Sequence, residues 1–137
     1  MHEIVGVVVK GGGTASKNLI RQMPGLSEYA PGIETCYLGT LNLSLDRPVR
    51  IYKPDVTTGP IPWRNPPERF DLTRVEIQPS ASAEWQRAWV YGPHDSPWRE
   101  RPFTLEIIAP RLDVTRGSLV KVRFLRPMEE VPGLRLL

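Results

Sequence analysis

Fifteen prolines interrupt this chain of 137 residues, and they limit its fold more than any other feature. Proline has no backbone N–H and breaks the interior of helices, so the chain is poorly suited to long helices. Between the prolines lie apolar runs with the β-branched or alternating composition of strands. Six such runs predict strands at residues 4–9, 41–45 with a continuation at 49–51, 70–77, 85–91, 103–108 and 119–125.

One short helix is expected between the first two strands. Ser16 is a suitable N-cap, Leu19 and Met23 belong to an apolar face, and Pro24 should end the helix. Residues 54–67 hold five prolines and are expected to form a long surface loop.

These elements predict an all-β fold with one or two short helices. The length of the chain suits a single domain over residues 1–137. Six strands with long loops favour a closed or nearly closed barrel, although periodicity alone does not distinguish a barrel from a sandwich.

The composition excludes several classes of protein. The single cysteine, Cys36, has no partner for an intramolecular disulfide, and His2 and His94 are too far apart for a zinc motif. The apolar run at 4–9 is too short for a membrane span and is not a secretion signal, so we expect a cytoplasmic protein with no membrane partner. The sequence pattern does not distinguish a monomer from a dimer.

Positive charge is concentrated in one part of the chain. Residues 97–126 hold seven basic and three acidic residues, an excess of +4 against a formal net charge of +3 for the whole chain. A basic face suits a polyanion, either nucleotide phosphates or nucleic acid. Equally, these arginines can be solvated residues at strand edges.

A glycine-rich segment follows the first predicted strand. Gly11, Gly12, Gly13 and Thr14 would let backbone N–H groups approach an anion, and the start of a helix would add its dipole. The segment is neither a Walker A loop nor a dinucleotide-binding fingerprint. Three glycines between two elements are more often a flexible turn.

Two neutral oxygen ligands lie two residues apart at the second predicted strand. Thr40 and Asn42 would share the face opposite Leu41 and Leu43. Mg²⁺ prefers hard oxygen ligands, and a nucleotide can supply the remaining negative charge. From spacing alone, a solvent-facing start of a strand is the more common explanation.

The fifth predicted strand carries a carboxylate among apolar residues. Glu106 lies on the face opposite Leu105 and Ile107. A carboxylate in such surroundings can have a raised pKa and serve as a general base. An ordinary exposed glutamate is the more frequent case.

Taken together, these motifs resemble the archaeal-type, CTP-dependent riboflavin kinases. The resemblance runs from about residue 4 to 125 and is carried by four ordered segments: Gly6–Gly13 (Gly-Val-Val-Val-Lys-Gly-Gly-Gly), Gly39–Asp46 (Gly-Thr-Leu-Asn-Leu-Ser-Leu-Asp), Glu106–Pro110 (Glu-Ile-Ile-Ala-Pro) and Leu119–Phe124 (Leu-Val-Lys-Val-Arg-Phe).

The resemblance implies a six-stranded cradle-loop β-barrel that phosphorylates riboflavin to FMN, with CTP as donor and Mg²⁺ as cofactor. It implies that Gly11, Gly12 and Gly13 line the nucleotide phosphates, with Thr14 beside them. It also implies that Thr40 and Asn42 hold the metal and that Glu106 is the base near the ribityl hydroxyl. Phosphoryl transfer needs positioning and charge neutralisation more than covalent participation of the protein, so these roles are chemically consistent.

Two other functions stay open. The first is a non-catalytic module of the same fold that binds a nucleotide or a flavin. It is favoured by Ala15, where the family has a further glycine, and by Thr115–Ser118, where the family has acidic residues. The second is a basic barrel that binds nucleic acid, which is the weakest of the three because the tryptophans do not alternate with Lys or Arg along the chain.

Overall fold

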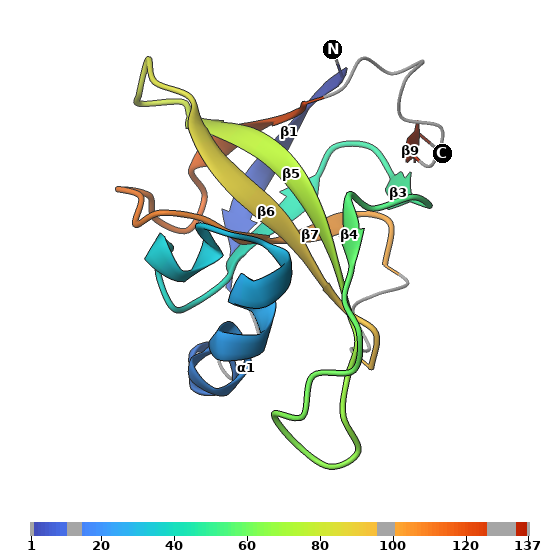
Figure 1. The fold of residues 1–137 in the computed structure, drawn as a ribbon. Coiled ribbons are helices and arrows are strands. Elements are labelled where there is room, and N and C mark those ends of the chain that lie inside the picture. Colours follow the sequence, from blue (N-terminus) through green and yellow to red (C-terminus); the bar gives the residue numbers. More distant parts are fainter. Residues whose placement is uncertain (1, 11–14, 96–100, 126–133, 137) are drawn as a thin grey trace.

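The computed structural model describes residues 2–10, 15–95, 101–125 and 134–136. Nine strands, one α-helix and one 3₁₀ helix occur in these ranges (Figure 1). In chain order they are β1 (His2–Val9), α1 (Ala15–Tyr29), η1 (Ile33–Thr35), β2 (Leu41–Leu45), β3 (Val49–Ile51), β4 (Val56–Thr57), β5 (Phe70–Pro79), β6 (Gln86–Pro93), β7 (Thr104–Ile108), β8 (Leu119–Phe124) and β9 (Leu134–Leu136).

The main sheet is antiparallel and closes on itself. Its strands follow the order β4-β5-β6-β7-β2-β1-β8, and β8 pairs in turn with β5. Six strands therefore form a ring, with β4 attached to β5 outside it, while β3 and β9 form a separate pair. The predicted all-β class is confirmed, and each of the six predicted strands has its counterpart in this ring.

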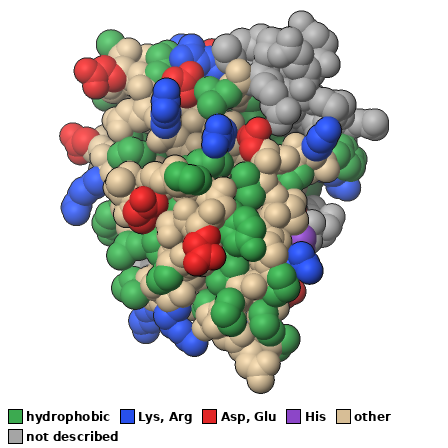
Figure 2. Space-filling model, in the orientation of Figure 1, with side chains coloured by type: hydrophobic (Ala, Val, Ile, Leu, Met, Phe, Trp, Pro, Cys, Tyr) green, Lys and Arg blue, Asp and Glu red, His purple; other side chains and the backbone are tan. Residues whose placement is uncertain are grey.

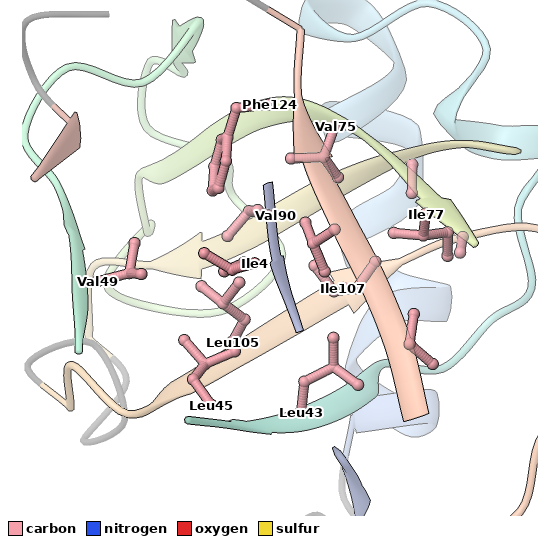
Figure 3. Packing of buried hydrophobic residues seen from close by; sticks show 14 of the residues in the cluster. Ile4, Leu43, Leu45, Val49, Val75, Ile77, Val90, Leu105, Ile107 and Phe124 are labelled. Carbon is pink, nitrogen blue, oxygen red and sulfur yellow. The ribbon is translucent and has the colours of Figure 1, made fainter. Parts of the chain in front are cut away.

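The inside of the ring is filled by aliphatic side chains and one phenylalanine. Figure 3 shows Ile4, Leu43, Val75, Val90 and Phe124 pointing toward one another from five different strands. Successive side chains of a strand point to opposite faces, so each strand contributes every second residue to this core. The alternation seen along residues 41–45 is thus confirmed, with Leu43 and Leu45 buried.

A second apolar cluster lies outside the ring, beneath α1. Leu19, Met23 and Leu26 of the helix pack against the outer faces of β5, β6 and β7, and Figure 1 shows the helix on that side of the sheet. The outward residues at this contact are Phe70 and Leu72 of β5, Trp89 and Tyr91 of β6, and Ile108 of β7.

The prediction that Pro24 ends the helix is wrong. Helix α1 continues through Pro24 to Tyr29, and Ser16 is its second residue rather than its cap. A proline inside a helix costs about 3 kcal/mol. Beyond Pro24 the helix buries Leu26 completely and leads to Ala30, which is also fully buried. Full burial of a leucine contributes about 1.5–3 kcal/mol, so packing offsets most of the cost.

Residues 54–67 are not simply a surface loop, as the prolines had suggested. They include β4, which pairs with β5, and Ile61, which bridges to Glu68. Thr58 and Ile61 are buried, and Ile61 belongs to the cluster beneath α1. Prolines here shape a segment that folds back onto the sheet.

Within the described part of the chain, no helix has the length and apolar character needed to cross a membrane.

Candidate functional site

Asn42 and Glu106 are direct neighbours on the outer face of the ring. They are register partners in the antiparallel pair of β2 and β7. Their sequence neighbours Leu43, Leu105 and Ile107 belong to the inner core, so both polar side chains point outward. Directly opposed residues of antiparallel strands have Cβ atoms about 4.5–5.5 Å apart. The structure therefore brings together two of the residues that the sequence singled out.

The same row of the sheet continues to the end of β1. Val9, the last residue of that strand, is the register partner of Asn42 on the other side. The chain then leaves the sheet through Lys10 and enters α1 at Ala15. The predicted phosphate-binding residues Gly11, Gly12, Gly13 and Thr14 form this connection and lie outside the described residues. The connection thus begins next to Val9, the partner of Asn42, and ends at the first residue of α1.

Burial raises the pKa of Glu106 above the ordinary value of 4.5. Tyr91 of β6 lies near enough to sense its charge, and the Tyr91 hydroxyl donates a hydrogen bond to the buried side chain of Gln22 on α1. Burial also raises the pKa of Tyr91, with the nearby Glu106 contributing in the same direction. A carboxyl group with a raised pKa beside polar groups can accept a proton more readily at neutral pH.

A cavity of about 350 Å³ opens where β6 and β7 separate. These strands pair at only two positions, Trp89 with Ile108 and Val90 with Ile107. Beyond that point residues 91–93 and 104–106 form opposite walls of the cavity, and β3 with Tyr52 covers one side. Glu106 lines this cavity, so it adjoins both Asn42 and a partly open space of the size that small-molecule sites have.

Thr40 lies just before β2, close to Asn42 along the chain. It lines a second cavity of about 210 Å³, together with Tyr37, Leu41 and Ala109. The amide Nδ2 of Asn42 donates a long hydrogen bond, 3.5 Å, to the backbone carbonyl of Thr40. Thr40 thus borders the second cavity, and its backbone carbonyl contacts the side chain of Asn42.

The oxygen atoms at this position fit a hard divalent cation. The hydrogen bond from Nδ2 leaves Oδ1 of Asn42 without a donor among the described residues. The carboxylate of Glu106 is its neighbour, and Mg²⁺ takes such oxygens together with water and phosphate ligands. In the described ranges no group of three or more His, Cys, Asp or Glu residues could hold a metal, so a site here would depend on neutral oxygens and on its ligand.

Acidic residues lie beside Arg123, one basic residue of the stretch at 97–126. Of its seven basic residues, Arg99 and Arg126 lie outside the described residues. Arg123 of β8 lies between Glu3 and Glu76 in the register of the sheet, and Glu76 is in turn opposite Arg87. Figure 2 shows side chains of both signs interspersed over the face it presents.

Arginine–tryptophan contacts across strands were not visible in the sequence. Arg123 lies 3.9 Å from the ring centroid of Trp85, and Arg74 lies 5.2 Å from that of Trp89. These partners are separated along the chain, and only strand pairing brings them together. The guanidinium groups already lie over the rings, as in ordinary cation–π pairs of a folded protein.

Sequence reasoning also missed Asp71 and Thr73, which line the larger cavity from β5. One signal was available. Phe70 and Leu72 belong to the cluster outside the ring, whereas Val75 belongs to the inner core. The apolar positions of this strand thus change from even to odd numbers, and this change indicates that Asp71 and Thr73 share a face with the core.

No known family model matches the chain, and no curated protein matches it either.

Proposed function

We propose that this protein is a Mg²⁺-dependent phosphotransferase that moves the terminal phosphate of a nucleoside triphosphate to riboflavin, giving FMN. The observation that supports it most is the pairing of Asn42 with Glu106 at the edge of a cavity. The resemblance to the CTP-dependent riboflavin kinases favours CTP as donor and a cradle-loop barrel as the type of ring.

The donor side would use the connection between β1 and α1. Gly11, Gly12, Gly13 and Thr14 would offer backbone N–H groups to the phosphates. Asn42 and Thr40 would hold Mg²⁺, which when bound neutralises phosphate charge. The closeness of Val9 to Asn42 in the sheet supports this arrangement, because it joins the glycine segment to the predicted metal ligands.

The acceptor side would be the cavity between β6 and β7. Its volume of about 350 Å³ is at the lower end of the range for small-molecule sites, and Tyr52 gives it aromatic surface. Glu106 would take the proton of the acceptor hydroxyl as that oxygen attacks the phosphate. Its raised pKa, caused by burial, suits this role because the carboxylate becomes a stronger base.

The test is FMN formation from riboflavin with Mg²⁺ and each of CTP, ATP, GTP and UTP, followed by chromatography. We expect FMN with CTP and none without metal. Asn42→Ala should lower the rate about 100-fold or more, because it removes a group that orients charge in the transition state. Glu106→Gln should lower it by about two to four orders of magnitude.

Ser44→Ala is the matched control, since Ser44 lies on the same strand and face as Asn42, two residues along. It should leave the rate unchanged. FMN formed with a different nucleotide would retain the transferase and change its donor. No FMN with any donor, from folded protein that still binds riboflavin or a nucleotide, would instead support a non-catalytic binding module.

A further inference from the structure

One wall of the cavity between β6 and β7 is polar. It consists of Asp71 and Thr73, which are two residues apart on β5 and therefore point to the same side of the strand. Val75, two residues further along the same side of β5, belongs to the inner core. These two residues thus lie at the mouth of the ring, where its apolar interior gives way to the cavity.

The hydroxyl group of Thr73 is buried and has no hydrogen-bond partner among the described residues. Thr73 is only 4% exposed, and no hydrogen bond joins its side chain to any other residue in the described ranges. Buried polar groups are nearly always hydrogen-bonded, and leaving one unpaired costs about 1–3 kcal/mol. Because Thr73 lines the cavity, a molecule inside the cavity is a suitable partner for this hydroxyl.

Two hydrogen bonds hold the carboxylate of Asp71 in place. Its Oδ1 accepts hydrogen bonds from the hydroxyl of Thr57 and from Nε2 of His94, each at 2.9 Å. A carboxylate can only accept hydrogen bonds, so the proton of the second bond belongs to the histidine. The side chains of Asp71 and His94 are both 25% exposed. Two bonds to one oxygen fix the orientation of the carboxylate beside the cavity.

The charges around the cavity are balanced. Asp71 and Glu106 supply two carboxylates, and Arg50 and Arg101 supply two guanidinium groups to the same lining. This balance favours a neutral ligand over an anion or a cation.

The aromatic lining favours a flat molecule. Tyr52, about half exposed, borders the cavity, whereas the ring of Tyr91 stacks with Phe70 in the cluster beneath α1. Aromatic side chains pack well against planar rings and bury much apolar area. A neutral, planar molecule that carries hydrogen-bond donors satisfies all the features of this cavity.

We propose that Asp71 and Thr73 form the recognition site for the acceptor, in which they bind the N–H or O–H groups of a neutral, planar heteroaromatic compound. His94 and Thr57 are positioning residues that orient Asp71. The inference rests on the proposed function for the choice of riboflavin as probe, but it concerns binding alone. Riboflavin offers two sources of donors, the imide N–H of its ring and the hydroxyls of its ribityl chain.

The experiment measures binding of riboflavin by quenching of its fluorescence, with the full chain and without nucleotide or metal. Thr73→Val removes only the hydroxyl and keeps the shape, so it should weaken binding about 10-fold. Asp71→Asn should weaken binding to a similar degree. Thr73→Ser, which keeps a hydroxyl, is the matched control and should bind nearly as the wild type does.

Thermal unfolding of Thr73→Val separates recognition from a structural role. Since the buried hydroxyl has no hydrogen-bond partner among the described residues, its removal should leave the melting temperature equal or higher while binding weakens. A lower melting temperature together with unchanged riboflavin binding would overturn the proposal. Binding that is equal in the wild type, Thr73→Val and Asp71→Asn would also overturn it, as would a wild type that binds no riboflavin.

Two modified flavins identify which donor is bound. If the ring imide is the donor, the effect of Asp71→Asn should vanish with riboflavin methylated on the imide nitrogen. If the ribityl hydroxyls are the donors, it should vanish with lumiflavin, which lacks the chain. An effect of unchanged size with both compounds would refute recognition of either donor. Weaker binding by the variants without FMN formation by the wild type would retain this site and refute the phosphotransferase.

Discussion

Gly6 offers the sharpest test of how the ring is packed. It points into the core from β1, between Ile4 and Val8, and faces Leu43 of β2. A Cβ atom at this position would lie 2.8 Å from Cβ of Leu43, and 3.2 and 3.3 Å from its Cδ1 and Cγ. Favourable contacts between carbon atoms are about 3.5–4.0 Å, so Gly6→Ala creates a severe overlap.

The overlap cannot be relieved by a change of rotamer. The Cβ atom of Leu43 is attached directly to the backbone, and the pairs Val8–Leu43 and Gly6–Leu45 hold that backbone against β1. Overpacking of this kind costs about 1–3 kcal/mol. Replacing glycine also restricts the unfolded chain, which offsets about 0.4–1 kcal/mol. We therefore expect Gly6→Ala to lower the free energy of unfolding by about 1–2 kcal/mol.

Thermal and urea unfolding measure this change directly. In a chain of this size 1 kcal/mol corresponds to about 4 °C, so the melting temperature should fall by roughly 4–8 °C. Gly39→Ala is the matched control, because its Cβ would meet only the ring of Tyr37, which is 54% exposed and can turn away. A Gly6→Ala protein as stable as the wild type would refute the packing of β1 against β2.

Two further predictions concern charged groups. Burial raises the pKa of Glu106, so the folded protein holds this proton to higher pH and its free energy of unfolding falls as pH rises from about 4.5 through the raised pKa. Glu106→Gln should remove this fall. Urea unfolding should therefore find the variant at least as stable as the wild type at pH 7 and no more stable at pH 4. Arg123 donates two hydrogen bonds to Glu76, at 3.1 and 2.8 Å, and lies over Trp85. Arg123→Ala should lower the free energy of unfolding by about 1–2 kcal/mol, measured by thermal unfolding, and Arg123→Lys should recover less than half of this loss because lysine lacks the planar, multiple-donor group. Full recovery by lysine would show that charge alone matters.

Local patterns were sufficient to predict most of the strands. The alternation along 41–45 depends only on which face of a strand meets the core, and that is a property of consecutive residues. The length of α1 was not predictable in the same way. Proline disfavours a helix locally, but burial of Leu26 and Ala30 against the sheet outweighs this preference, and burial depends on the whole fold.

The candidate site shows the same division. Asn42 and Glu106 were each recognisable from residue type and from their apolar neighbours. Their pairing across β2 and β7 joins residues 64 positions apart, which no spacing rule could have indicated. Asp71 was not predictable, because an aspartate in a strand has no distinctive sequence pattern. Only the fold brings it into hydrogen bonds with Thr57 and His94 and places it at the cavity.

The sequence by itself determined the all-β class, the positions of the strands and the chemical character of the candidate residues, because these follow from local periodicity and residue type. Only the tertiary structure decided which strands meet, how β8 closes the ring against β5, and where β6 and β7 separate to leave a cavity. The physical reason is that strand pairing joins distant segments through backbone hydrogen bonds, which all residues except proline can make alike. Register and closure are therefore set by the packing of the two apolar clusters together.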